Sequence, residues 1–391
     1  MSKEQPINLN ISDFLKVFAV ASVILQTVLS YVLTHSPQTE AMNSIGSFYR
    51  MSKYSAPMFI FAIIYNMVLK SQAESYLEFL KEKFYELVLP YVVWSSLYLY
   101  AFPSLQQRMP YETPLGFLGK VLSGDGAAHL WYAVMMLQFQ LFMPYFIWLE
   151  TRITKNKKVI LPIVFFTIGA HILWCFWYQK MIFPYAETSL WYLIDRSGLS
   201  YLIYGIFGVI AAKYQGGIFT FLKKTRVVLF LLFLFIFWQA VQGNLFDGTQ
   251  MTPNDLPYLD PLQSAYSLLI IGLVFYLGTQ GIAKKIRLLP MVKWIATYAY
   301  RSYLANVFIF QVVLKLVHPF LTNQPVSLVI LVLYMGTFVG SFGLTVVIEH
   351  FLKAYLSWDA LYLYRDMFLN RNHRPKSWES ILNCHKNCYT L

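Results

Sequence analysis

The sequence predicts an all-α fold: a polytopic integral membrane protein with about ten transmembrane helices and both termini in the cytoplasm. Three observations predict it. Apolar residues make up 57% of the 391 residues, and charged residues only 13%, about half the usual share of a soluble domain. Long apolar runs recur along the whole chain. Basic residues gather in every second connection between these runs.

A helix needs about 20 largely apolar residues to cross the hydrocarbon core of a bilayer. The run 227–237 is continuous and does not alternate, which excludes the strands of a membrane barrel. The first run is too long for a signal peptide and lacks a small-residue cleavage site, so we expect it to remain as a membrane helix. The expected spans are 11–33, 54–70, 84–103, 128–149, 158–178, 191–212, 226–243, 262–281, 295–317 and 326–352.

The distribution of Lys and Arg supports this count independently of hydropathy. With the N-terminus inside, the inner connections and the two ends hold 22 of the 31 basic residues, and the outer connections hold seven. The outer connection 244–261 holds none. Cytoplasmic loops of membrane proteins carry such an excess. We therefore assign the net charge of +12 to membrane orientation, and we expect no nucleic-acid partner because that requires one contiguous basic face.

The chain is expected to form one membrane domain, residues 1–352, followed by a basic cytoplasmic tail, residues 353–391. We expect the tail to lie against anionic lipid head groups, with a specific partner site as the alternative. Cys384 and Cys388 lie in this tail on either side of His385, which is too few ligands for a metal site. No metal is expected.

Polar groups at membrane depth are the candidates for function, because the sequence holds no phosphate-binding loop, zinc-protease motif or nucleophile elbow. Lys16 is either an anchor that reaches the inner interface or a cation that holds the phosphate of a donor. Gln26 follows ten residues later, about 15 Å along the same helix. Gln26 and Asn306 each suit an interhelical hydrogen bond. Arg301 lies deeper than a usual anchor and can pair with a carboxylate or a donor phosphate.

Histidines form the second group of candidates. His129 opens the fourth expected span and is either a member of the interfacial aromatic belt or a base that contacts a sugar, with Trp131 as a stacking platform. His35 and His318 lie near the outer ends of their spans, and His171 lies deep in the fifth. A lone membrane histidine more often makes a helix contact than performs catalysis.

Four stretches resemble the acyltransferase type 3 family of ten-helix membrane proteins. The resemblance covers about residues 8–350 and is strongest to the branch linked to poly-N-acetylglucosamine modification or export in biofilm-forming bacteria. The stretches are 13–19, 83–94, 129–132 with Pro144, and 298–306.

The resemblance implies transfer of an acyl group, usually acetyl from acetyl-CoA, to a hydroxyl of an extracytoplasmic glycan. It implies a multi-pass protein of a bacterial plasma membrane. The implied partners are the bilayer, a surface glycan or its lipid-linked precursor, and a glycan synthase.

The sequence departs from the family pattern at its chemical positions. The first helix of the family usually carries an Arg and, ten residues later, a His; here these positions are Lys16 and Gln26. Lys16 keeps the charge but loses the bidentate fork, and an amide cannot act as a base. Asn306 stands where the family often has His, and Ala299 where it often has Ser.

Two functions follow. The first is an O-acyltransferase that acts on a surface glycan, and the second is a non-catalytic relative that exports or positions a glycan or partners a synthase. A secondary transporter would show internal repeats and paired broken helices, which the sequence lacks. In the first hypothesis His129 or His35 is the base, and Gln26 and Asn306 donate hydrogen bonds to the oxyanion. The expected contacts of acyl-CoA are Lys16, Arg301 and Lys83. The expected contacts of the glycan are His35, Trp131 and Tyr303.

Overall fold

The computed structural model is helical throughout the residues that it describes: 10–35, 40–70, 75–106, 111–185, 193–241, 259–321 and 324–355. The chain divides into two compact units, 1–345 and 346–391, and each is described by itself. Of the second unit, only residues 346–355 are described, and they are helical. Cys384, Cys388, the tail beyond residue 355 and most of the 244–261 connection lie outside the described residues.

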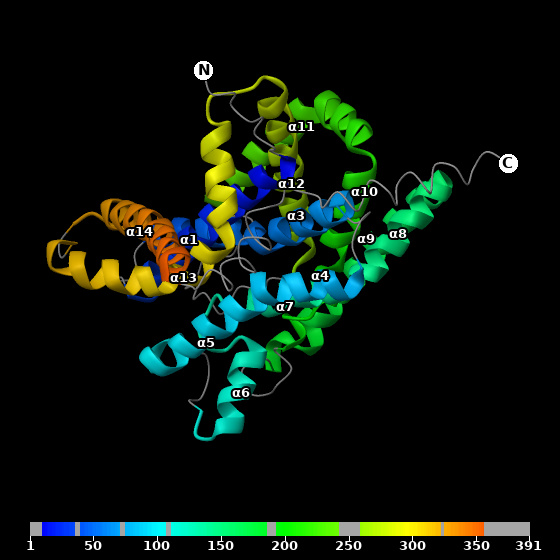
Figure 1. Cartoon of the computed structure of the whole chain (residues 1–391). Coiled ribbons are helices and arrows are strands. Elements are labelled where there is room, and N and C mark those ends of the chain that lie inside the picture. The colour runs from blue at the N-terminus through cyan, green and yellow to red at the C-terminus, as the bar shows by residue number, and fades with distance from the viewer. Residues whose placement is uncertain are drawn as a thin grey trace, which may run out of the picture. The chain divides into compact units, whose positions relative to one another are not determined.

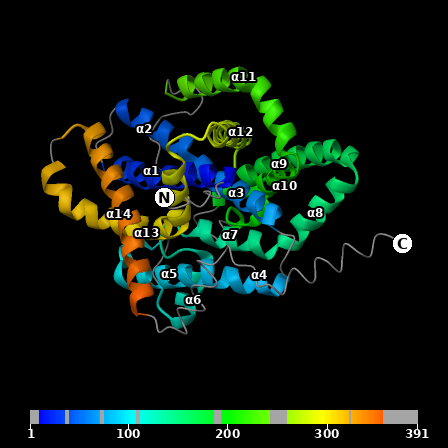
Figure 2. The same cartoon turned by 45° about the horizontal axis from the view of Figure 1, so that its top comes forward.

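The described residues contain fourteen α-helices, whose arrangement is drawn in Figure 1 and Figure 2. They are α1 (Ile11–His35), α2 (Glu40–Met51), α3 (Ser55–Lys70), α4 (Tyr76–Lys83), α5 (Leu89–Ala101), α6 (Pro114–Ser123), α7 (Trp131–Leu141), α8 (Met143–Lys155), α9 (Ile160–Met181), α10 (Leu202–Lys213), α11 (Gln215–Val241), α12 (Pro261–Ala283), α13 (Leu289–Leu321) and α14 (Val326–Tyr355). Three short helical turns also matter below: η1 (Ser52–Tyr54), the π-helical η2 (Phe84–Val88) and η7 (Gly198–Tyr201).

Five segments among the described residues are long and apolar enough to cross a membrane: α1, Lys157–Met181, α12, α13 and Val326–Leu352. The pair α7 and α8 forms a sixth candidate that is bent by 55°. Two other expected spans contain shorter helices, since α3 has 16 residues and α10 has 12. The all-helical membrane fold is thus confirmed in outline. The count of ten crossings and the side of each terminus stay predictions.

Large apolar side chains on α9 point outward. Phe165 is 67% exposed, Phe166 78% and Leu173 71%. Water would penalise such a surface, whereas lipid tails solvate it. This outer face of α9 is therefore suited to contact with lipid.

The helices α1 and α13 run parallel in constant register. Near their starts the Nζ atom of Lys293 lies 3.1 Å from the Oδ2 atom of Asp13. Further along, the hydroxyl of Thr27 donates to the Oδ1 atom of Asn306 at 2.9 Å. Two parallel spanning helices require an odd number of crossings between them, and the expected order, in which they are the first and ninth spans, satisfies this requirement.

The helix α3 runs antiparallel to α1. Asn10, just before α1, donates from its side chain to Asn66 near the end of α3, whereas Gln26 donates to Ser55 at the start of α3. The helix α3 also packs closely against α10. A Cβ atom added to Gly208 on α10 would lie 3.0 Å from the backbone oxygen of Phe61 on α3. Small residues allow such close approach between membrane helices. The helix α1 also contacts α12 and α13 (Figure 2).

Candidate functional site

His129 lies in a tight turn, residues 124–130, that joins α6 to α7. Gly124 opens the turn with φ at +78°, and a Cβ atom there would lie 2.5 Å from the Cα atom of Trp131. Only glycine fits both restrictions. The backbone N–H of Asp125 donates to the carbonyl of Lys120, which closes the end of α6. The local sequence thus fixes the direction in which the chain enters α7.

The ring of His129 has one bonded nitrogen and one buried nitrogen without a partner. Its Nε2 atom lies 3.3 Å from the backbone oxygen of Leu304 on α13. A carbonyl oxygen only accepts hydrogen bonds, so Nε2 must carry the proton. In the neutral ring Nδ1 is then unprotonated, and it is buried with no hydrogen-bond partner among the described residues. This tautomer presents a lone pair, as a general base requires.

Tyrosines from three elements surround this ring. The ring centroids of Tyr98 and Tyr303 lie 5.4 and 5.3 Å from that of His129, both edge to face. The hydroxyl of Tyr98 donates to the same Leu304 oxygen at 2.8 Å, and the hydroxyl of Tyr303 donates to the backbone oxygen of His129. The ring of Tyr132 lies 5.5 Å from Tyr303, and its buried hydroxyl has no partner in the part of the chain that the structure describes. Two polar atoms without partners therefore lie in one aromatic cluster.

Asn306 lies beside this cluster and is fully buried. Its amide nitrogen donates to the backbone oxygen of Tyr303, and its amide oxygen accepts from Thr27. The side chain therefore fastens α13 to α1 at the level of His129. One of its two amide N–H groups is used in these contacts.

The amide of Gln26 serves a different contact. Its Nε2 atom donates to the backbone oxygen of Ser52 and to the hydroxyl of Ser55, each at 2.7 Å. The hydroxyl of Ser22 donates to the same Ser52 oxygen at 2.8 Å. Both N–H groups of the Gln26 amide are thus donated, and the side chain fastens η1 and the start of α3 to α1.

Lys16 and His35 lie at other levels of α1. Lys16, half-buried, precedes Thr27 by 11 residues, about 16 Å along the helix. His35 is exposed, follows Thr27 by eight residues, about 12 Å, and stacks on the ring of Tyr31 at 4.3 Å. The structure therefore brings His129, Tyr303 and Asn306 together, whereas Lys16 and His35 lie apart from them.

Lys83 is held by two carboxylates before α5. Its Nζ atom lies 3.0 Å from Glu82 and 2.5 Å from Glu86. Burial lowers the pKa of Lys83, but the two carboxylates raise it by more, so the net shift is upward. Arg301 is half-buried on α13, one turn before Leu304.

Lys16, Arg301 and Lys83 are the cations named for the phosphates of a CoA donor, and of these Lys83 faces two carboxylates. Trp131, half-buried at the start of α7, packs against Tyr201, with ring centroids 6.1 Å apart. Within the described ranges, no three side chains of His, Cys, Asp or Glu gather as metal ligands would.

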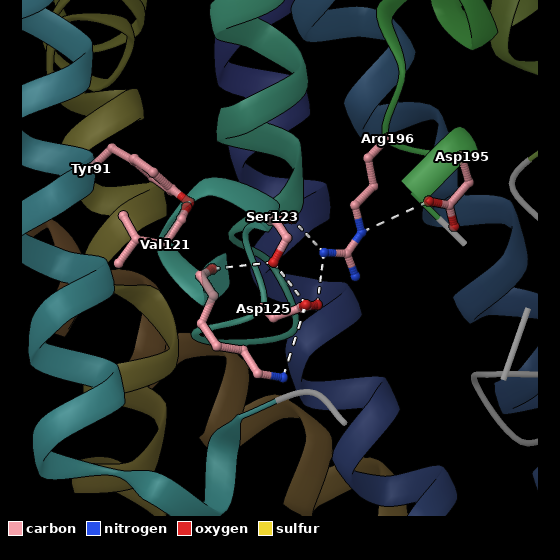
Figure 3. Close-up of polar contacts among 7 residues, drawn as sticks. Tyr91, Val121, Ser123, Asp125, Asp195 and Arg196 are labelled. Atoms are coloured by element: carbon pink, nitrogen blue, oxygen red, sulfur yellow. Dashed lines mark hydrogen bonds and ion pairs between the residues drawn. The ribbon is translucent and has the colours of Figure 1, made fainter. Parts of the chain in front are cut away.

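An ion-pair network behind the turn was not predicted from the sequence (Figure 3). The carboxylate of Asp125, 2% exposed, receives Nη1 of Arg196 at 2.8 Å and the hydroxyl of Ser123 at 2.7 Å. The Nζ atom of Lys120 lies 4.0 Å from it, and Arg196 also donates to the backbone oxygen of Ser123 at 2.5 Å. Asp125 and Arg196 are 71 residues apart, so no local pattern could pair them.

An open cavity of about 300 Å³ lies next to this network. Its lining comprises Gly119, Leu122, Ser123, Val134, Gln138, Leu193 and Arg196. The polar lining groups bind one another and their neighbours, since the amide of Gln138 donates to the Arg196 oxygen at 3.0 Å and accepts from the Gly198 N–H at 2.8 Å.

Lys53 in η1 is a further residue that sequence reasoning missed. It was expected in an outer connection, but its side chain is 1% exposed. Burial, and then the charge of Arg50, lower the pKa of Lys53 and the charge of Asp195 raises it, which together bring the pKa to about 7. Arg50 itself pairs with Asp260 at 3.2 Å. Charged residues that are far apart in sequence thus interact in a chain, from Asp260 through Arg50, Lys53 and the segment 195–196 to Asp125.

Comparison with known proteins supports the resemblance inferred from the sequence. A family model described as an acyltransferase domain matches residues 9–346. No curated protein and no solved structure matches the chain. Because the match covers most of the chain, the chain belongs to the acyltransferase type 3 family and is a multi-pass membrane protein with an acyltransferase domain.

Proposed function

We propose that this protein is an O-acyltransferase that moves an acyl group, acetyl in the simplest case, from acyl-CoA to a hydroxyl of a cell-surface glycan. His129 is the general base of the proposal. The observation that carries it is the tautomer of the ring, in which the Leu304 carbonyl occupies Nε2 and leaves the lone pair of Nδ1 available.

The proposed reaction has two steps, attack on the thioester and departure of the CoA sulfur. The glycan oxygen attacks the thioester carbonyl, and Nδ1 of His129 takes its proton. The carbon–sulfur bond then breaks, and the proton passes from the imidazolium to the departing sulfur, which yields the ester and free CoA. Because Nδ1 is buried, the acceptor reaches it only when neighbouring aromatic side chains move aside.

Two donors are proposed for the oxyanion. They are the second N–H group of Asn306 and the buried hydroxyl of Tyr132. Gln26 keeps a structural role in this proposal, because its amide N–H groups are already donated to Ser52 and Ser55.

The donor side of the proposal uses the cations on α1 and α13. Lys16 lies about 16 Å before the Asn306 contact along α1. The extended arm of CoA between its phosphates and its sulfur has a comparable length. Lys16 therefore holds the phosphates in this proposal. Arg301, about 8 Å before Asn306 along α13, remains a candidate contact of the donor nearer to its thioester, and His35 and Trp131 remain candidate glycan contacts.

The test uses the purified full chain in nanodiscs with labelled acetyl-CoA and poly-N-acetylglucosamine. We expect label on the glycan with the wild-type protein and with His171→Ala, and none above background with His129→Ala. Wild-type protein that folds and binds glycan without transferring label would overturn the proposal. That outcome would favour the non-catalytic relative that exports or positions a glycan, which the interhelical contacts of Gln26 also suit.

A further inference from the structure

The turn that carries His129 also carries the most enclosed carboxylate of the ionic network. Asp125 lies four residues before His129, and its carboxylate has partners on α6 and on the distant segment 193–197 (Figure 3). Arg196 reaches the turn twice, at the Asp125 carboxylate and at the Ser123 carbonyl. These contacts lie at the start of the turn, and the contact between His129 and α13 lies at its end.

The cavity beside Arg196 offers an alternative role for these groups, as a ligand site. The contacts of its polar lining argue against that role. Arg196, Ser123 and Gln138 bind one another, the turn and the backbone at Gly198. Groups arranged in this way hold two segments of the chain together.

We infer that Asp125 and Arg196 are positioning residues that hold the turn 124–130 so that the His129 ring keeps its contact with the Leu304 carbonyl. This inference rests on the proposed function of His129 as the base. It assigns to the ion pair a part in catalysis, although neither residue contacts the reacting atoms.

The geometry makes His129 sensitive to small movements of its turn. The distance of 3.3 Å from Nε2 to the Leu304 oxygen is near the upper limit for a hydrogen bond. A displacement of a few tenths of an ångström would break this contact. The carbonyl would then no longer keep the proton on Nε2, and the ring could turn so that Nδ1 points elsewhere. Removal of one partner of the ion pair would produce such a displacement, because it takes the nearest counterion, at 2.8 Å, from the other buried charge and leaves only Lys120 at 4.0 Å for Asp125 or Asp195 at 3.8 Å for Arg196.

The test compares Asp125→Asn, Arg196→Gln, Arg196→Lys and the double variant D125N/R196Q in the transfer assay. We expect kcat to fall about 10–100-fold in Asp125→Asn and Arg196→Gln, with KM for acetyl-CoA within about threefold. The double variant should be no worse than either single one, and Arg196→Lys should recover part of the loss. The matched control is Glu150→Gln, which breaks the 2.8 Å pair with Lys213 between α8 and α10 and should keep the wild-type kcat.

A second measurement does not depend on activity. Diethyl pyrocarbonate acylates unprotonated imidazole, and mass spectrometry separates the modified histidines. We expect His129 to react about tenfold faster in Asp125→Asn than in wild type, with His171 as an internal control whose rate stays unchanged.

The outcomes separate the two proposals. Absence of transfer by the wild type overturns the proposed function alone, and the modification rates then decide on the positioning role. A wild-type kcat together with a wild-type His129 modification rate in Asp125→Asn would overturn the positioning role. If thermal unfolding shows that Asp125→Asn does not fold, Arg196→Lys provides the same two readouts with the positive charge retained.

Discussion

Two histidines, the buried His171 and the half-buried His129, occupy very different surroundings in this protein. His171 lies in the middle of α9, where its Nε2 atom is 2.8 Å from the hydroxyl of Ser264 on α12 and 3.5 Å from the Cys175 sulfur. His129 lies in a turn, with a backbone carbonyl at Nε2 and no partner for Nδ1 among the described residues. The first histidine joins two helices through side chains, and the second is held by backbone and by its turn.

The difference shows why membrane depth alone does not indicate catalysis. A hydroxyl can donate or accept, so the contact of His171 with Ser264 permits either tautomer. The carbonyl at His129 only accepts, so it selects one tautomer and leaves a defined lone pair. His171 thus makes a helix contact, and His129 is the histidine that we propose for proton transfer.

The largest expected effect compares the two histidines directly. His129→Ala should lower the rate of transfer at least about 100-fold, because it removes the base, with little change in thermal stability. His171→Ala should leave the rate within a few-fold and lower the free energy of unfolding by about 1 kcal/mol, because it removes an interhelical contact. Transfer assays and thermal unfolding in nanodiscs measure both. Equal loss of transfer in the two variants would remove the distinction between them.

The next effect concerns the hydroxyl that holds the backbone of His129. Tyr303→Phe removes the donor to the His129 carbonyl and should lower kcat about tenfold, because the turn loses a contact with α13. The matched control is Tyr204→Phe, whose ring lies 6.3 Å from that of His171. It should affect stability only. A kcat unchanged in Tyr303→Phe would show that this contact does not position the base.

The buried amino group of Lys53 in η1 gives stability a dependence on pH. The pKa of Lys53 lies near 7 in the folded protein against an ordinary value of 10.5, so the unfolded chain binds more protons between these values. Stability should therefore rise as the pH increases from about 7 to 10.5, and the full penalty should apply below pH 7. Lys53→Met should flatten this rise. Unfolding curves of the two proteins that stay parallel across this range would contradict the burial of a lysine in η1.

Gln26→Ala should produce the smallest effect. It removes two hydrogen bonds from α1 to η1 and α3, which should lower the free energy of unfolding by about 1 kcal/mol. Transfer should stay within about threefold of wild type. A loss of transfer as large as that of His129→Ala would assign catalysis to the position where the family usually has histidine.

Much of the fold could be predicted because apolar length alone reports on long membrane helices. The runs that became α1, α9, α12, α13 and α14 were expected within a few residues of their observed bounds. Hydropathy is less informative at the start of the sixth expected span. This span was expected from residue 191, whereas residues 198–201 form η7 and α10 begins at Leu202. Apolar and polar residues alternate irregularly over 193–201, so hydropathy alone does not show where the long helix begins.

The candidate site could be predicted in part. His129, Tyr303 and Asn306 were named from stretches that resemble the family, and they do lie together. The pairing of Asp125 with Arg196 and the enclosure of Lys53 could not be named, because both depend on segments far apart in sequence.

In the proposed reaction, the imidazole of His129 takes the proton of the acceptor hydroxyl. Chemical rescue tests this step, with free imidazole added to His129→Ala during the transfer assay. We expect imidazole to restore transfer in proportion to its unprotonated concentration, because the free ring fills the space that the side chain left. No restoration in a folded His129→Ala protein, or equal stimulation of His171→Ala, would contradict the claim.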